Sequence, residues 1–253
     1  MLVLLPPSET KIDGGDGPPL RLDVLPYPEL DTVRKELVTD LVELSGDLVA
    51  SRKALGISPS LDSEIARNAA IWTSPTMPAL LRYTGVLYDA LDVRSLRGTA
   101  AARAQERLAV GSALFGLLRA CDPVPAYRLS AGSALPGRAT IAARWKPVLE
   151  PVLATIATGE LVVDLRSGSY AALAKIPGAV TVTVLAEHPD GHRTVVSHFN
   201  KAHKGRLARL LAGSRAEPSD AAGVATLARR AGMRVERAGK ALSVIVSSDA
   251  AMH

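Results

Sequence analysis

MLVLLPPSETK, residues 1–11, contains the strand around which this chain is expected to fold. The apolar run LVLL predicts a fully buried strand, and the two prolines after it end that strand because proline cannot donate a ladder hydrogen bond. Ser8, Glu9 and Lys11 therefore follow the carboxyl end of a buried strand, where side chains often face a ligand. Lys11 could meet a phosphate there or, if desolvated, act as a base or a nucleophile; the alternative is a solvated loop lysine.

Beyond this stretch, helical and strand patterns are mixed without a strict strand-helix-strand rhythm. Helices are expected at residues 32–50, from Asp62 onward, and at 99–106, 146–157, 201–212 and 219–231. Strands are expected at residues 160–165, 180–187, 194–199, 233–237 and 242–246, and residues 108–118 are expected to turn from a strand into a short helix. The pattern indicates an α+β fold, a mixed sheet with flanking helices, in a single domain covering residues 1–253.

Positive charge is concentrated in the C-terminal third of the chain. Lys and Arg counted against Asp and Glu give −2 for residues 1–120, 0 for 121–192 and +8 for 193–240. The stretch SHFNKAHKGRLAR, residues 197–209, carries much of this charge. Such a stretch in a chain with few aromatic residues points to a polyanion or a phosphate-bearing molecule. The alternative is that arginines are scattered over solvated surface, as in proteins from genomes rich in G and C.

Two arginines bracket a proline-rich loop in the middle of the chain. Arg119 and Arg128 could each grip a phosphate in a bidentate way or hold the loop by pairing with Asp122. For Arg128, the neighbouring Tyr127 favours contact with a ligand.

A second polar junction, DLRSGSY at residues 164–170, lies between a predicted strand and a short helix. Arg166 and the backbone amides and hydroxyls around Ser167 and Ser169 could bind an anion there, and Ser169 could instead be only a helix cap. The junction lacks the GxxxxGK[ST] pattern, and no GxGxxG fingerprint occurs in the chain, so hydrolysis at a P-loop is disfavoured.

Several classes of protein are disfavoured by composition. The N-terminal apolar run is too short for a secretory signal or a membrane span, which favours a cytoplasmic protein. The single cysteine, Cys121, excludes an internal disulfide and is either structural or, with a lowered pKa, a peroxide-sensing thiol. His198 and His203 suggest a metal, but Lys201 and Lys204 beside them would repel a cation. No metal, cofactor or obligate protein partner is therefore expected.

Several of these segments together resemble a known family. They are the strand followed by PPSETK, the segment YTGVLYDAL, the run GSALFGLLRACDPVPAYRLSAG, Trp145, VVDLRSGSY and SHFNKAHKGRLAR. In this order and spacing, the chain resembles the YaaA family of bacterial peroxide-stress proteins over nearly its whole length. The resemblance implies a cytosolic protein that lowers damage by hydrogen peroxide, limits free intracellular iron and binds DNA, duplexes included, through a basic cleft.

The resemblance also implies an unusual fold, similar to no common superfold, that contains a helix-hairpin-helix element. In this chain the element would be residues 49–72. Its turn, Leu55-Gly56-Ile57, has one glycine where the usual loop has two, and a single-glycine turn between helices is also common in ordinary packing.

Two functions follow from these patterns. The first is a DNA-binding peroxide-stress protein whose basic residues neutralise phosphates with little sequence preference. The second is an enzyme acting on a small phosphorylated or nucleotide-like metabolite, with Lys11, Glu9 and Tyr170 as candidate catalytic residues. The candidate contacts to DNA or phosphate are Ser8, Lys11, Arg119, Tyr127, Arg128, Arg166, Ser167, Ser169, Lys201, Lys204 and Arg206.

Overall fold

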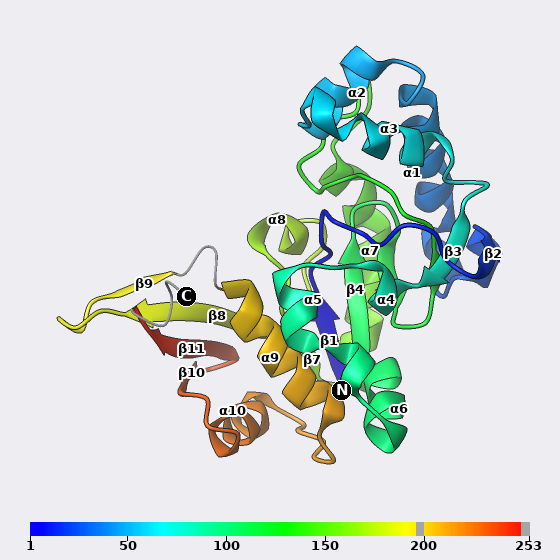
Figure 1. Cartoon of the computed structure of the whole chain (residues 1–253). Helices are drawn as coiled ribbons and strands as arrows, with labels where there is room; N and C mark the ends of the chain where they lie inside the picture. Colours follow the sequence, from blue (N-terminus) through cyan, green and yellow to red (C-terminus); the bar gives the residue numbers. More distant parts are fainter. Residues whose placement is uncertain (196–199, 249–253) are drawn as a thin grey trace.

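The computed structural model describes residues 1–195 and 200–248, which are built around an eight-stranded sheet (Figure 1). Seven strands lie in the order β10-β11-β8-β7-β1-β4-β5, and β9 pairs with β8. Their bounds are β1 Leu2–Leu5, β4 Leu108–Ser112, β5 Gly116–Arg119, β7 Val162–Asp164, β8 Val180–Glu187, β9 Arg193–Val195, β10 Val235–Ala238 and β11 Ala241–Ser247. A small second sheet contains β2 (Gly17–Pro19), β3 (Pro75–Pro78) and β6 (Pro123–Val124).

The centre of the large sheet is parallel. β1 pairs in parallel with β4 on one side and β7 on the other, and the parallel pairing continues through β8 to β11. Antiparallel pairs occur where β5, β9 and β10 join the sheet. All four residues of β1 are buried, as expected for a strand in the middle of a parallel sheet. The mixed sheet with flanking helices is thus confirmed, and its parallel centre makes the class mixed α/β rather than α+β.

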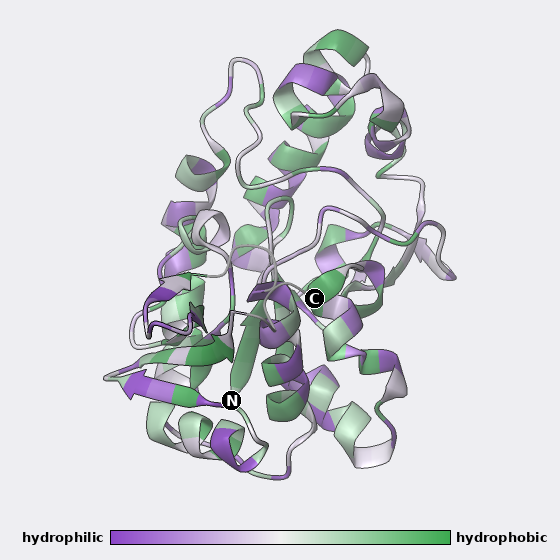
Figure 2. Ribbon diagram, turned by 60° about the vertical axis from the view of Figure 1, so that its left-hand side comes forward, coloured by the Kyte–Doolittle hydropathy of each residue, from purple (hydrophilic) through white to green (hydrophobic). Residues whose placement is uncertain are grey.

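Helices cover the sheet and build the lobe at the top of Figure 1. Helix α9 packs on β1 and β8 and also contacts α5, α6 and α10. In Figure 2, hydrophobic residues are concentrated on the central strands and on the helix sides that face them. The helix bounds are α1 Asp31–Leu44, α2 Leu48–Leu55, α3 Asp62–Ala69, α4 Ala79–Arg82, α5 Val86–Leu91, α6 Gly98–Arg107, α7 Ile141–Gly159, α8 Gly168–Ala171, α9 Asn200–Gly213 and α10 Ala221–Arg230.

The helix expected at residues 32–50 is two helices, α1 and α2. Ser45 and Gly46 interrupt the first helix, and Asp47 begins the second by accepting hydrogen bonds from two backbone amides with its side chain. Helix α2 ends at Gly56, which has the positive φ of 63° typical of a helix C-cap, and a 3-10 turn at Pro59–Leu61 leads into α3. A helix-hairpin-helix element at residues 49–72 is not confirmed.

Residues 108–118 form a hairpin of β4 and β5 instead of a strand followed by a helix. Gly116 makes the turn possible because its φ of 73° is strained for other residues, and Trp145 of α7 occupies the space beside it. The predicted hairpin at 180–199 is confirmed for β8 and β9, while residues 196–199 lie outside the described part of the chain. The hairpin at 233–246 is confirmed as β10 and β11.

Helix α7 begins earlier than the helix expected at 146–157. Thr140 caps it by accepting a hydrogen bond from the backbone amide of Ala143, and both Pro147 and Pro151 lie within the helix. Among the described residues, no helix combines the length and the apolar character needed to cross a bilayer.

Candidate functional site

The carboxyl ends of β1, β4 and β7 meet at one edge of the sheet, because these neighbouring strands are parallel. The chain first adds β4 on one side of β1 and later adds β7 and β8 on the other side. Such a change of direction is a topological switch point, and open parallel sheets bind ligands beyond the carboxyl ends of their strands at such a point. The polar segment after β1 therefore lies where a ligand site is expected.

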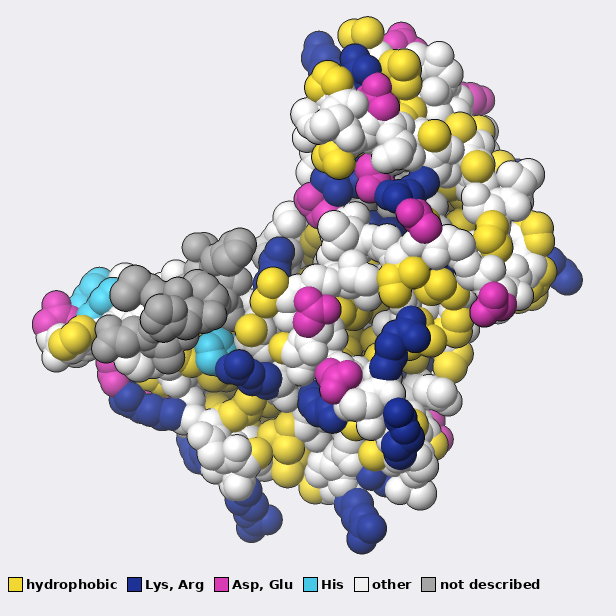
Figure 3. Space-filling model, viewed as in Figure 1, with side chains coloured by type: hydrophobic (Ala, Val, Ile, Leu, Met, Phe, Trp, Pro, Cys, Tyr) yellow, Lys and Arg dark blue, Asp and Glu magenta, His cyan; other side chains and the backbone are white. Residues whose placement is uncertain are grey.

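A pocket of about 540 Å³, the carboxyl-edge pocket, occupies this position. Four segments line it: the loop after β1, the start of α5, the turn after β7 and the first turns of α9. In Figure 3, these segments lie beside the notch between the upper lobe and the arm formed by β8 to β11. Its lining residues are Pro6, Pro7, Ser8, Glu9, Thr10, Thr84, Gly85, Val86, Leu87, Tyr88, Leu165, Ser167, Ser169, Tyr170, Asn200, Lys201 and Lys204.

A larger depression of about 870 Å³ lies at the opposite edge of the sheet, but its acidic groups already have structural partners. Glu160 lies 3.0 Å from the N-terminal amino group, and Glu217 lies 2.9 Å from Arg107. Asp220 caps α10. The carboxyl-edge pocket is therefore the better candidate site.

Lys204 is a buried cation in the wall of the carboxyl-edge pocket. Its ammonium group donates hydrogen bonds to the backbone carbonyls of Leu165 (3.1 Å) and Arg166 (3.3 Å). Burial lowers the pKa of Lys204, and the nearby Asp164 carboxylate works in the opposite direction. Because an ammonium carries three N–H groups, two carbonyl partners leave one donor for a bound anion.

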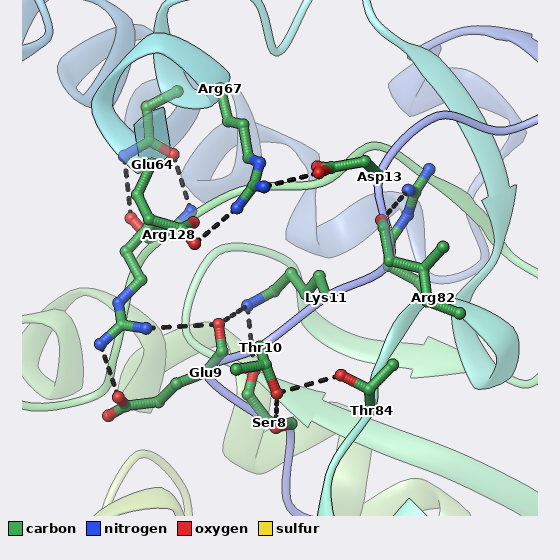
Figure 4. A network of polar contacts seen from close by, with 12 residues as sticks. Ser8, Glu9, Thr10, Lys11, Asp13, Glu64, Arg67, Arg82, Thr84 and Arg128 are labelled. Carbon is green, nitrogen blue, oxygen red and sulfur yellow. Dashed lines mark hydrogen bonds and ion pairs between the residues drawn. The ribbon is translucent and has the colours of Figure 1, made fainter. Parts of the chain in front are cut away.

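Lys11 lies next to the same pocket and is held by the segment that lines it (Figure 4). Its Nζ donates to the carbonyls of Ser8 (2.9 Å) and Glu9 (3.2 Å) and lies 4.4 Å from the centre of the Tyr127 ring and 5.4 Å from that of Tyr83. Burial, more than any neighbouring charge, lowers the pKa of Lys11 to about 7. The side chain can therefore change protonation near neutral pH.

Arg128 is fixed over this segment by contacts of both its guanidinium group and its backbone. Its guanidinium donates to the Glu9 carboxylate at 2.5 Å, and its backbone amide and carbonyl pair with the side chain of Asn68 at 2.7 and 2.9 Å. Asn68 is fully buried in α3. The upper lobe thus positions Arg128 against the loop after β1.

Tyr127 belongs to a chain of buried hydroxyl groups behind Lys11. Its OH lies 2.8 Å from the OH of Tyr83 and 2.7 Å from Oγ of Ser112. The Ser112 oxygen also accepts two backbone N–H bonds, which fix its position at the end of β4. Burial raises the pKa of both tyrosines, so they are neutral at physiological pH.

Tyr170, a candidate catalytic residue, is in the wall of the carboxyl-edge pocket. Burial is the main cause that raises its pKa, so its OH is also neutral at physiological pH. Ser167 and Ser169 lie at the same turn, with their hydroxyl oxygens 3.5 Å apart. These three side chains lie together in the wall of the carboxyl-edge pocket.

The Arg166 guanidinium is not part of this group of ligand-facing side chains. It forms two hydrogen bonds of 2.9 Å with the carboxylate of Asp164 and also donates to the carbonyls of Tyr170 and Ala174. Both partners of the ion pair are buried, with 2% and 9% of the side chains exposed. Arg166 therefore shapes the turn after β7, since four of its five side-chain N–H groups donate to these partners.

Arg119 lies at the far end of the sheet. It is the last residue of β5 and pairs with Ala109 near the start of β4, because β5 runs antiparallel to β4. Its side chain donates to the carbonyl of Glu106, and its backbone amide donates to Asp122 at 2.7 Å. The Arg119 guanidinium therefore bonds a backbone carbonyl, and Asp122 is held by the Arg119 backbone amide rather than by the guanidinium pairing that the sequence suggested.

Asp122 provides a pH-dependent test of this loop. Burial raises its pKa from 3.8 to about 6, so the folded chain binds the proton more tightly than the unfolded chain. The stability gained by this tighter binding is fully present below about pH 4 and is lost as the pH rises through 6. Asp122→Asn, which can still accept the Arg119 amide, is expected to increase the free energy of unfolding at pH 7.5 by about 1–2 kcal/mol and to give no gain at pH 4. Denaturant unfolding at the two pH values measures this difference; a variant less stable at pH 7.5 would contradict the dominance of burial.

The basic residues of α9 divide between two surfaces. Lys201 and Lys204 line the carboxyl-edge pocket, whereas Arg206 borders a shallow groove with Leu96 and Arg209. On the face drawn in Figure 3, Lys and Arg side chains are interspersed with Asp and Glu. The predicted cations are thus only partly gathered in one recess.

The remaining metal candidates can be compared only within the described residues. There, no three His, Cys, Asp or Glu side chains come close enough to hold a metal ion. Burial and the neighbouring Arg206 lower the pKa of His203, and His198 lies outside the described part of the chain.

Several pocket residues were missed by the sequence reasoning. Thr10 and Thr84 hydrogen-bond to each other at 3.0 Å, where residues 10–12 pair with residues 82–84. Tyr88 donates to the Pro6 carbonyl at 2.9 Å. Thr84 and Tyr88 belong to the segment YTGVLYDAL, but only the pairing of this segment with the distant loop after β1, which contains Thr10, places them at the pocket.

Fold and site together define a mixed α/β protein with a lysine- and hydroxyl-lined pocket at the carboxyl ends of its parallel strands. A family model described as peroxide stress protein YaaA matches residues 1–233. The chain belongs to this YaaA family of peroxide stress proteins.

Similar proteins extend over nearly the same length. The chain is 52% identical over 240 residues to a UPF0246 protein of Corynebacterium efficiens, with 93% of this chain and 95% of that protein covered. It is 44% identical over 240 residues to a UPF0246 protein of Streptomyces coelicolor, with 93% and 92% covered. A more distant UPF0246 protein, from Dinoroseobacter shibae, is 32% identical over 76% of both chains.

Proposed function

We propose that this protein acts in the response to peroxide by binding a small phosphate-bearing or nucleotide-like molecule in the carboxyl-edge pocket, as an enzyme on that molecule. The observation that carries this proposal is the convergence of Lys204, Lys201 and the hydroxyls of Ser167 and Ser169 at the switch point of the sheet. Lysines and hydroxyls are suitable donors for phosphate oxygens.

The shape of the site favours a small ligand over a long polyanion. Tyr88 and Tyr170 enclose the pocket, whose volume of about 540 Å³ is within the range of small-molecule sites. Contact with the DNA backbone requires charge, but it does not require enclosed tyrosine and serine side chains. The separation of Arg119 and Arg206 from the pocket points in the same direction.

Calorimetric titration tests the proposal. The ligands are phosphate-bearing compounds, from inorganic phosphate to nucleotides. Lys204→Met is expected to weaken binding by roughly 10–100-fold, because a charge-assisted hydrogen bond is lost. A double variant, Ser167→Ala with Ser169→Ala, changes the same pocket through exposed side chains and is expected to weaken binding about tenfold.

Lys240→Met is the matched control, since this exposed lysine lies at the opposite edge of the sheet. Equal binding by the wild type and the two pocket variants, after folding is verified by circular dichroism, would reject the pocket as the phosphate site.

The second candidate function is binding to duplex or distorted DNA. The basic face of α9 favours it, because Lys201 and Arg206 are exposed there and neither forms an ion pair within the described part of the chain. Affinity for DNA would then decrease steeply with salt.

Arg206→Gln separates the two candidates, because Arg206 lies outside the carboxyl-edge pocket. If DNA is the partner, this change is expected to weaken duplex binding and to reduce the salt slope by about one. It should leave phosphate binding in the pocket unchanged. A duplex affinity that is nearly independent of salt would reject the DNA candidate.

We also propose that, in the cell, the protein protects against hydrogen peroxide and limits free iron. A deletion strain complemented with wild type or Lys204→Met provides the test, with survival in hydrogen peroxide and chelatable iron as readouts. Full complementation by a folded Lys204→Met protein would argue that the pocket has no part in the response.

A further inference from the structure

Lys11 is the titratable group of this region that ligand binding alone does not explain. It lies beside the carboxyl-edge pocket, and its Nζ is hydrogen-bonded to the carbonyls of two residues that line it, Ser8 and Glu9. The Lys11 side chain folds back onto its own loop and faces two aromatic rings.

The charges around Lys11 are already balanced by one another (Figure 4). Glu9 pairs with Arg128 at 2.5 Å, and Glu64 pairs with Arg67 at 2.5 Å. Arg67 also pairs with Asp13 at 2.6 Å. No carboxylate oxygen of the described residues forms an ion pair with Lys11 itself.

Burial has the largest effect on the protonation of Lys11. The two glutamates favour the ammonium and the two arginines oppose it, and each of these charges has a smaller effect on the pKa than burial has. Burial then decides the result and favours the neutral amine. Tyr83 and Tyr127, whose pKa values are raised, remain neutral and add no charge.

We propose that Lys11 is the general base of this site and accepts a proton from the ligand held in the carboxyl-edge pocket. The Lys11 lone pair forms the new N–H bond, and the electron pair of the broken bond remains on the ligand. The proton later passes to solvent. This role rests on the proposed function, because it requires a ligand in that pocket.

The surroundings of Nζ favour proton transfer over covalent attack. Two carbonyls and the ring of Tyr127 already surround the nitrogen, so formation of a bond to carbon would have to displace these contacts. A proton needs only hydrogen-bond distance between donor and acceptor. The neutral amine can also donate to both carbonyls while its lone pair accepts, which keeps the base oriented.

Competitive acetylation of the whole chain with trace acetic anhydride tests the proposal, with every lysine quantified by mass spectrometry between pH 5 and 11. Lys11 is expected to react with a midpoint near pH 7, and the exposed Lys53 and Lys240 serve as internal references. Inorganic phosphate or a phosphate-bearing ligand that binds the pocket is expected to slow the reaction of Lys11 several-fold and to leave the two exposed lysines unchanged.

Two variants test the cause of the shifted midpoint in opposite directions. Glu64→Gln removes a charge that favours the ammonium and should lower the midpoint by about half a pH unit or more. Arg128→Gln removes a charge that opposes it and should raise the midpoint by a similar amount.

The outcomes separate this inference from the proposed function. A Lys11 midpoint equal to that of Lys53, or no reaction of Lys11 at any pH, overturns the inference even if phosphate binds the pocket. If Lys11 reacts with a midpoint near pH 7 but a bound ligand does not slow its acetylation, Lys11 is not the base that accepts a proton from that ligand. If calorimetry detects no phosphate-bearing ligand at all, the proposed function fails and the base role fails with it, while the measured midpoint still reports a reactive amine.

Discussion

Asp164→Ala is expected to lower the free energy of unfolding by about 3–5 kcal/mol, because it leaves the Arg166 guanidinium buried without its anion. The carboxylate accepts two hydrogen bonds of 2.9 Å from that guanidinium and a third, of 3.0 Å, from the Arg166 backbone amide. No water can replace these bonds easily, since the Arg166 side chain is only 2% exposed. Thermal and denaturant unfolding measure the loss, which corresponds to a melting temperature lower by roughly 10 °C.

A double variant, Asp164→Ala with Arg166→Met, is the control for this interpretation. It removes both charges and keeps apolar volume at the site, so it should recover a large part of the lost stability. The recovery would assign the loss to the uncompensated guanidinium rather than to the change in side-chain volume. If Asp164→Ala costs less than about 1 kcal/mol, the ion pair does not stabilise the turn after β7.

The ion pair also bears on the ligand site, through the backbone that it holds. Lys204 donates to the carbonyls of Leu165 and Arg166, which lie in the turn that the pair stabilises. The position of the buried ammonium therefore depends on Asp164. We expect the single variant to weaken phosphate binding in the pocket even at temperatures where it is fully folded.

Arg166 illustrates which parts of the site the sequence can predict. The sequence placed Arg166, Ser167 and Ser169 at a junction between a strand and a helix, and this local prediction is confirmed by β7 and α8. It could not reveal whether the guanidinium faces a ligand or Asp164, because both choices have the same spacing. Burial and the two hydrogen bonds decide between them.

The remainder of the site depends on contacts between segments that are distant in sequence. Asn68 fixes the backbone of Arg128 across 60 residues, and Arg128 reaches Glu9 across 119 residues. Hydrophobic periodicity contains no information about such pairings. The sequence could therefore identify Glu9 and Arg128 as candidates but could not pair them.

The fold was predictable where a pattern is local. The strand LVLL, the hairpin around Pro189-Asp190-Gly191 and helices α9 and α10 follow from short-range signals. The hairpin of β4 and β5 could not be predicted in this way, because both strands are buried and their apolar runs show no alternation of apolar and polar residues. The turn between the two strands can be recognised only from the structure, in which the Trp145 ring lies beside Gly116.

Gly205→Ala is expected to have the second large effect, because this glycine lies where α9 packs tightly against α5. A Cβ atom at residue 205 would lie 2.2 Å from the backbone carbonyl oxygen of Leu87 and 2.9 Å from Cβ of Ala90. A backbone atom cannot turn away as a flexible side chain can, so the two helices must separate. We expect the free energy of unfolding to decrease by about 3 kcal/mol, although alanine has the higher helix propensity.

The separation should also disturb the ligand site, since α5 and α9 pack against each other and both contribute residues to the carboxyl-edge pocket (Figure 1). Lys201 and Lys204 would move away from Tyr88, and we expect affinity for a phosphate-bearing ligand to decrease at least tenfold. Gly213→Ala is the matched control in the same helix, because its Cβ would meet only Cδ2 of Leu96, at an ordinary 3.7 Å. That variant should be as stable as the wild type, or more stable by up to about 1 kcal/mol, and should bind normally. Equal stability of the two alanine variants would contradict the close contact between α9 and α5 on which the shape of the pocket depends.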